Sequence, residues 1–299
     1  MTKNPDIVAL AEGRHNNPFA LLGVHNTPNG RVVRTLQPGA KAVDLVGPSG
    51  DKLASMQRIH DAGLFEAPMP PRKRRYALNI TWQSGDTQLT EDPYRFPSTL
   101  GEMDLYLLGE GSDKFVYRKL GAHPLSVGDV SGTRFAVWAP NASRVSVVGD
   151  FNTWDGRRHV MRLHPGNGIW EIFVPGVGNG AKYKYEITDA DGKLLPLKAD
   201  PYGTLHEPPP GNSSIVFQSA FEWQDDDWIA QHRTGPRLDT PTSIYEVHLG
   251  SWRRKDDGSY LSYRDLANEL VPYVAAVSYT HLTLPTKESR GWWGGGGGG

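Results

Sequence analysis

The chain contains a stretch of sequence that returns, in the same order, about one small domain's length further along. The aligned pairs are 33–47 with 135–149, 75–81 with 182–188, and Asp92-Pro93-Tyr94 with Asp200-Pro201-Tyr202. The spacing between partners grows slightly in one direction, as expected if the second copy carries a few loop insertions. A chance similarity would not keep this order, so two modules of similar fold follow one another.

Both copies consist of short runs in which every second side chain is apolar, with glycine and proline between the runs. Clear examples are 144–148, 170–174 and 183–187. Such alternation places successive side chains on opposite faces of a strand, and many short strands separated by turn residues are typical of antiparallel sandwiches. We therefore predict a mostly β fold with two tandem immunoglobulin-like β-sandwich modules, at 1–107 and 108–224.

The sequence after the second copy changes character. Residues 225–242 hold acidic residues, proline and threonine, and are typical of a linker. An apolar strand then opens the segment at 243–276, where Ser262 and Asp265 predict the capped start of a helix. A strand, a loop and a helix in this order open a (β/α)8 barrel, so the predicted fold ends in a truncated barrel. We expect 277–299 to be a non-native or disordered tail, although YTHL and LP within it could form a second strand.

Composition excludes several classes of function. Without cysteine the chain has no disulfide, no thiol nucleophile and no cysteine-bound zinc. A net charge of −1 gives no electrostatic attraction to nucleic acid or to an anionic membrane. The ten histidines show no ligand spacing, and no stretch is as apolar as a signal peptide or a membrane span. We expect a cytoplasmic monomer that holds no metal or cofactor and binds neither nucleic acid nor membrane.

Several segments of the second copy are similar to those of a known family. They are WAPNASRVSVVGDFNTWDG at 138–156, GIWEIFVP at 168–175, YKYEI at 183–187 and KADPYG at 198–203. Together they resemble the glycogen- and starch-binding module that precedes the barrel in α-amylase-superfamily branching and debranching enzymes. YEVHLGSWRR at 245–254 resembles the first barrel strand of glycogen branching enzymes, and the doubled module resembles the bacterial type. The resemblance implies that the chain is the N-terminal fragment of such an enzyme.

The resemblance also implies a binding site. In related modules the glucan lies near a tryptophan, a lysine and an asparagine, which correspond here to Trp154, Lys184 and Asn212. These residue types suit an α-glucan such as glycogen or starch, whose sugars offer apolar faces to an aromatic ring and hydroxyls to polar groups. An aromatic that often precedes the DPY segment has no counterpart in this chain. Two alternatives stay open, in which Trp154 packs between domains and Lys184 is only solvated.

Four other conspicuous residues are interpreted as structural. Trp138 and Trp170 lie within alternating runs, and we expect both to fill the core. Glu246 and His248 fall on the first predicted barrel strand, where we expect structural or domain-contact roles.

The family reaction cuts an α-1,4 bond and rejoins the fragment as an α-1,6 branch. The resemblance implies an aspartate nucleophile, a glutamate acid/base and a stabilising aspartate, all on later barrel strands. A complete barrel needs about 250 residues, far more than follow Ser243. We therefore assign no catalytic residue and predict that this chain alone is inactive.

Two other identities stay open. The chain could be a non-catalytic glycogen-binding or regulatory module, although its continuation beyond residue 220 argues against this. It could also come from a debranching or trehalose-releasing relative, but such relatives usually carry a single module before the barrel. The genomic sequence beyond codon 276 would discriminate between these identities.

Overall fold

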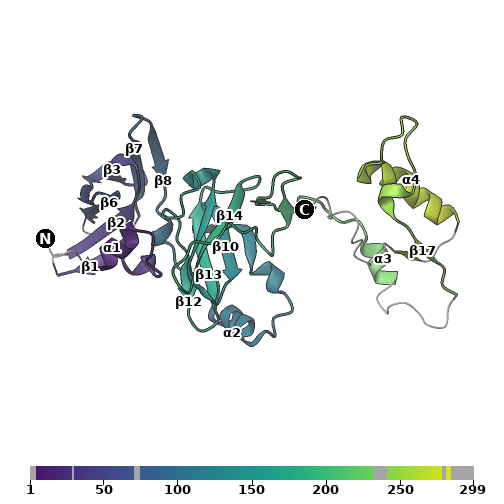
Figure 1. Ribbon diagram of the computed structural model, residues 1–299, viewed down its shortest axis with the longest axis horizontal. Coiled ribbons are helices and arrows are strands. Elements are labelled where there is room, and N and C mark those ends of the chain that lie inside the picture. The colour runs from purple at the N-terminus through teal and green to yellow at the C-terminus, as the bar shows by residue number, and fades with distance from the viewer. Residues whose placement is uncertain (1–4, 29, 71–74, 232–240, 278–280, 284–299) are drawn as a thin grey trace, which may run out of the picture. The chain divides into compact units, whose positions relative to one another are not determined.

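The computed structural model forms two compact units, Met1–Ala220 and Phe221–Gly299 (Figure 1). The structure describes residues 5–28, 30–70, 75–231, 241–277 and 281–283. Within these residues the fold is mostly β, with four antiparallel sheets of four strands each and one parallel pair of strands. The prediction of a mostly β chain is thus confirmed.

The first copy of the repeat contains two of the antiparallel sheets. One has the order β1-β2-β6-β5, with β1 Gly23–Thr27, β2 Gly30–Leu36, β5 Gln57–His60 and β6 Leu64–Pro68. The other has the order β4-β3-β7-β8, with β3 Ala40–Val46, β4 Lys52–Ser55, β7 Ala77–Trp82 and β8 Thr87–Thr90. Val33 and Phe65 from the first sheet share a core with Val43, Leu45 and Ile80 from the second. Helices α1 Pro5–Ala11, η1 Pro18–Ala20 and η2 Pro93–Arg95 flank these strands.

The second copy repeats this arrangement. One sheet has the order β12-β13-β10-β9, with β9 Gly121–Val127, β10 Val130–Trp138, β12 Arg162–His164 and β13 Ile169–Pro175. The other has the order β11-β14-β16-β15, with β11 Ala142–Gly149, β14 Lys182–Asp189, β15 Leu205–His206 and β16 Ser214–Ile215. Phe135 and Trp170 of the first sheet pack against Val145, Tyr183 and Tyr185 of the second.

The repeat in the sequence corresponds to a repeated strand pairing. Val43 of β3 lies opposite Ile80 of β7, and the aligned residues Val145 of β11 and Ile187 of β14 lie opposite each other in the same antiparallel sense. All four side chains lie in or against the cores of their own copies. The alignment therefore reflects equivalent positions in two similar structures.

The repeated DPY segment has a buried carboxylate at its centre. Asp92 accepts hydrogen bonds from the Tyr76 hydroxyl at 2.6 Å and from the Tyr94 backbone N–H at 3.0 Å. Asp200 does the same in the second copy, accepting from the Tyr183 hydroxyl at 2.7 Å. Burial raises the pKa of both carboxyl groups, that of Asp92 to about 6, against the lowering effect of these hydrogen bonds.

The core of the second copy also contains side chains from the first copy. Leu22, Leu36, Leu64 and Tyr94 from the first copy belong to the same apolar cluster as the core of the second. The Tyr94 hydroxyl also accepts a hydrogen bond from the backbone N–H of Val160 at 3.0 Å. Residues 1–220 therefore pack as one body.

The expectation for the two core tryptophans is half right. Trp170 is buried, but Trp138 is 62% exposed, so its predicted place in the core is wrong. Phe135 and Val137 point into the core, and alternation therefore turns Ala136 and Trp138 to the outer face of β10. The pattern showed that Trp138 lies on a strand, but it did not show which face of the strand is buried.

Helix α2, Glu102–Glu110, covers the outer face of β10 and β13 and was not predicted (Figure 1). Leu105 and Leu108 of this helix pack with Ala136 and Ile169. A single 3₁₀ turn, η3 Val116–Arg118, precedes β9.

The second unit contains a parallel pair of strands and a helix. Strand β17, Ile244–Glu246, pairs with β18, His281–Thr283, and α4, Tyr263–Ala276, lies between them in the sequence. The capping box is confirmed, because the Ser262 hydroxyl accepts from the Asp265 N–H and the Asp265 carboxylate accepts from the Ser262 N–H. The expected tail at 277–299 contributes β18, and its residues 278–280 and 284–299 lie outside those described.

Two further features of this unit concern earlier expectations. Helix α3, Asp226–Gln231, lies within the segment expected to be a linker, and 232–240 lie outside the described residues. The His248 ring bonds the Ser251 hydroxyl at 2.9 Å, beside the turn η5 Leu249–Ser251. Among the described helices, none has the length and apolar character needed to cross a membrane.

Candidate functional site

The three predicted site residues lie around the strands β11 and β14. Tyr183 and Tyr185 of β14 point into the core, so Lys184 between them points to the outer face of the sheet. Lys184 lies opposite Val148, and Tyr183 lies opposite Gly149, the last residue of β11. The chain that leaves β11 therefore starts beside Lys184.

A tight turn follows β11 and holds Trp154. The turn begins with η4, Asp150–Asn152, and the backbones of Thr153 and Trp154 have φ angles of 56° and 58°. Side chains other than glycine rarely adopt this left-handed region, and two in succession are costly unless the surroundings enforce them. Such enforced backbone positions are more common at functional sites than elsewhere.

Asn152 enforces this turn. It is buried; its side-chain oxygen accepts from the Gly149 N–H at 2.9 Å, and its NH2 group donates to the Val147 carbonyl at 2.9 Å. The Trp154 N–H donates to the Gly149 carbonyl at 3.0 Å and closes the turn. The asparagine of the FNTW segment thus has a structural role that sequence reasoning did not recognise.

The Trp154 ring is half-buried and fixed in orientation. Its indole N–H donates to the Asp150 carboxylate at 2.8 Å, which prevents the ring from turning freely. Asp150 was also not identified from the sequence, although its position four residues before Trp154 in the same turn could have indicated it. The remaining open side of the ring is an apolar surface at the end of the sheet.

The structure brings Lys184 and Asn212 together. The Lys184 ammonium donates a hydrogen bond to the side-chain oxygen of exposed Asn212. The loop that carries Asn212 is held by Glu207, which accepts from the Ser213 N–H at 3.1 Å and pairs with Lys182 at 2.6 Å. The hydrogen bond from Lys182 lowers the pKa of Glu207 to about 2, so this pair stays charged at neutral pH.

Among its described residues, the first copy of the repeat has no counterpart of Trp154 or Lys184 in this arrangement. The residue aligned with Lys184 is Ala77, and the chain after Gly47 forms a short turn at 48–50 without an aromatic residue. The two copies share their strands and their buried Asp–Tyr pair, but only the second carries the indole, the ammonium and the amide. The strands and the Asp–Tyr pair therefore serve the fold of both copies, whereas the indole, the ammonium and the amide are specific to the second copy.

The residue types of the cluster are suited to binding rather than to catalysis. An indole face, a primary ammonium and a carboxamide match a ring-shaped molecule with apolar faces and a hydroxyl rim. Among the described residues, no three histidines or carboxylates gather in a way that could hold a metal ion.

Comparison with known proteins shows similarity along most of the chain. A family model described as the N-terminal domain of alpha-1,4-glucan branching enzyme GlgB matches residues 3–94. A model for carbohydrate-binding module 48, the isoamylase N-terminal domain, matches residues 119–203. The second match contains Trp154 and Lys184 and ends before Asn212.

Curated relatives named 1,4-alpha-glucan branching enzyme GlgB match over nearly the whole chain. The protein from Rubrobacter xylanophilus is 54% identical over 95% of this chain. Those from Paramagnetospirillum magneticum and Rhodospirillum rubrum are 48% and 47% identical over 96% and 93% of it. The chain spans 39% of the length of each of these three relatives.

Proposed function

We propose that this chain is the N-terminal part of a 1,4-alpha-glucan branching enzyme and supplies its glucan-binding part, because residues 3–94 and 119–203 match the branching-enzyme N-terminal domain and carbohydrate-binding module 48. The ligand is an α-glucan polymer such as glycogen. The longer protein would cut α-1,4 chains and rejoin them as α-1,6 branches in glycogen biosynthesis. A cytoplasmic location and a monomeric state stay predictions from the sequence.

The finer description of the fold is part of this proposal. The two copies are immunoglobulin-like β-sandwiches, each with two sheets on a shared core. Residues 243–276 are the first β-α unit of a (β/α)8 barrel. The parallel pairing of β17 with β18, with α4 between them in sequence, supports this assignment, because parallel strands joined through a helix are the unit of such barrels.

The observation that carries the binding proposal is the Lys184–Asn212 contact on the outer face of β14, together with the fixed indole of Trp154 in the turn that follows the neighbouring strand β11. In this arrangement one glucose ring packs on the open face of Trp154, and the Lys184–Asn212 pair bonds its hydroxyls. Neither polar group is buried, so both exchange water for sugar at low cost.

Removing the indole should weaken binding strongly. Replacing Trp154 with alanine is expected to raise the dissociation constant for maltoheptaose about 30-fold, the effect of losing about 2 kcal/mol at an aromatic anchor. Isothermal titration calorimetry of the parent and W154A measures this change. Trp223→Ala is the matched control, since Trp223 is 76% exposed and lies outside the cluster. Equal affinity of W154A and the parent would rule out this site.

The chain by itself should bind glucan without branching it. A retaining transfer needs two carboxylates about 5 Å apart, on opposite sides of the bond that is cut. Neither the Trp154 cluster nor the family resemblance places such a pair within this chain. Incubation with amylose should therefore leave the iodine stain unchanged and create no α-1,6 linkages, and detectable turnover would contradict the assignment of no catalytic residue.

A further inference from the structure

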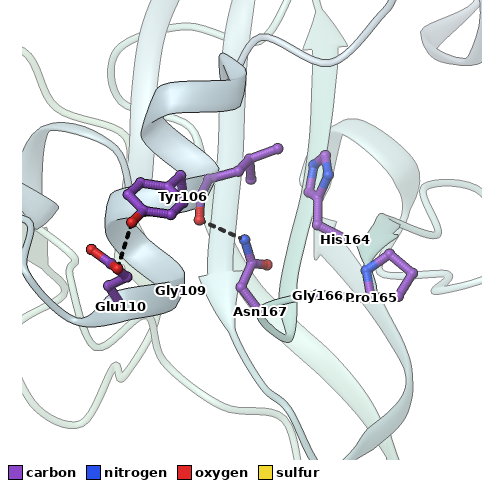
Figure 2. A pocket seen from close by; sticks show the side chains of 8 residues that line it. Tyr106, Gly109, Glu110, His164, Pro165, Gly166 and Asn167 are labelled. Carbon is purple, nitrogen blue, oxygen red and sulfur yellow. Dashed lines mark hydrogen bonds between the residues drawn. The ribbon is translucent and has the colours of Figure 1, made fainter.

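A hollow of about 500 Å³ lies between α2 and the turn that joins β12 to β13 (Figure 2). Tyr106 and Glu110 line it from the helix, and His164 and Asn167 line it from the turn. None of these residues belongs to the Trp154 cluster.

The hollow has a fixed aromatic wall. Tyr106 is 59% exposed, and its hydroxyl donates to the Glu110 carboxylate at 2.6 Å, one helical turn further on. Figure 2 shows this bond holding the phenol ring against the helix beside the hollow. A ring held in this way loses little conformational freedom when a ligand packs on it.

Asn167 holds the opposite wall in place. Its side-chain NH2 group donates to the Leu105 carbonyl at 3.0 Å, which fastens the turn to α2 (Figure 2). Gly109 of the helix faces the turn here, since a Cβ atom at this position would lie 3.4 Å from the Asn167 Cβ. The His164 ring is fixed by the Glu171 carboxylate at 3.0 Å.

A second exposed aromatic residue adjoins this turn. The Trp138 indole N–H donates to the Asn167 carbonyl at 3.0 Å, so the hydrogen-bonding capacity of the ring is already used. What Trp138 presents to solvent is therefore its apolar face. Asn167 is in direct contact with both the strand that carries Trp138 and the helix that carries Tyr106.

This surface lies on the other layer of the module from Trp154. Phe135 and Trp170 face the sheet that contains β14, whereas Ala136 and Ile169 of the same strands face α2. The Lys184 cluster belongs to the outer face of the β11–β14 sheet. The two surfaces are thus separated by the core of the module, and a ligand at one does not occupy the other.

The chemistry of the hollow selects its ligand. The exposed Tyr106 ring beside a carboxylate, an amide and an imidazole suits a pyranose polymer, whose rings pack on aromatics and whose hydroxyls donate to carboxylates. A phosphate or nucleic acid would be repelled by Glu110, and neither lysine nor arginine lines the hollow. We propose that this surface is a second α-glucan contact, on the face opposite the Trp154 site; the proposal rests on the function proposed above.

Two contacts on opposite faces have a specific consequence for ligands of different size. Maltoheptaose is too short to reach around the module and binds each surface separately. Branched glycogen offers many chain ends, so two of them can occupy both surfaces of one molecule and bind with avidity. Losing either surface should therefore reduce binding to glycogen.

Affinity electrophoresis through gels that contain glycogen tests the proposal with four proteins: the parent, Tyr106→Ala, Trp154→Ala and the double variant. We expect Y106A to raise the apparent dissociation constant for glycogen about two- to tenfold, the usual effect of losing an aromatic contact. Y106A should also weaken binding further in the W154A background. Tyr106→Phe keeps the ring but loses its bond to Glu110, so it should weaken binding less than Y106A. Tyr263→Ala, at an 82% exposed tyrosine of α4, is the matched control.

The outcomes separate the two proposals. If Y106A migrates like the parent while W154A is released from the glycogen, the second contact is overturned and the Trp154 site stands. If Y106A weakens retardation and W154A does not, the second contact stands and the Trp154 site fails. If neither variant changes retardation, both fail. Matching thermal unfolding curves for Y106A and Y106F exclude a folding defect as the cause of any loss.

Discussion

Replacing Asp200 with alanine should lower the free energy of unfolding by about 4 kcal/mol, because it leaves several buried donors without an acceptor. The Asp200 carboxylate accepts from the hydroxyls of Tyr183 at 2.7 Å and Tyr185 at 3.0 Å, both of them buried, and from the Tyr202 N–H at 2.8 Å. Each unsatisfied buried donor costs about 1–3 kcal/mol.

Guanidinium chloride denaturation of the parent, D200A and Asp200→Asn measures this loss. The asparagine variant keeps one acceptor oxygen for the tyrosine hydroxyls and should lose less than half as much stability. Asp191→Ala, at an exposed position of the preceding loop, is the control and should unfold like the parent. A D200A protein as stable as the parent would show that the Asp–Tyr pair does not support the fold.

Replacing Glu171 with leucine should cost about 3–5 kcal/mol, since it removes a buried charge from a fully bonded site. Glu171 lies on β13 and accepts from the Ser98 hydroxyl at 2.6 Å, from the N–H and hydroxyl of Thr99, and from His164. The bonds from Ser98 and Thr99 fasten the end of the first copy to the second. Burial alone would raise the pKa of Glu171, but the hydrogen bonds from His164, Ser98 and Thr99 outweigh it and lower the pKa to about 2.

The lowered pKa gives this prediction a distinctive dependence on pH. The ionised form of Glu171 is favoured in the folded state, so its contribution is complete above the unfolded value of 4.5 and is lost as pH falls towards 2. Asp92 has the opposite sign, because its raised pKa of about 6 makes the folded state gain stability as pH falls from 6 to 3.8. A loss of stability below pH 4 that is present in the parent and absent in Glu171→Gln would identify Glu171. An unchanged acid limb in E171Q would contradict this role.

Alternation and repetition predicted the strand framework well, because both report directly on side-chain faces and equivalent positions. The aligned pair Val43 and Val145 occupies equivalent strands, with Ile80 and Ile187 opposite them. The same reasoning failed for Trp138, because period-two alternation defines two faces of a strand without saying which one is buried. Helix α2 later covers that outer face, and its apolar residues gave no clear helical pattern.

The candidate site, like the fold, could be predicted from the sequence only in part. The resemblance to a family brought together Lys184 and Asn212, which the structure places in hydrogen-bond contact. It did not reveal that Asp150 fixes the Trp154 ring or that Asn152 enforces a left-handed turn. These roles depend on backbone angles and on atoms from the other end of the turn, which residue types alone do not specify. Two of the partners of Glu171, Ser98 and Thr99, were equally hidden, because they lie more than seventy residues away in sequence.

The shared core of residues 1–220 constrains how such proteins can evolve. Tyr94 and Leu22, Leu36 and Leu64 of the first copy complete the apolar interior of the second, so the second copy does not retain a finished interior when the first is removed. In an ancestor formed by duplication, each copy would have folded alone. The second copy lost that ability when side chains of the first became part of its core. Recombination that replaces one copy with the equivalent module of another protein must then also preserve the side chains that contact the other copy. We therefore expect the two copies to be inherited together.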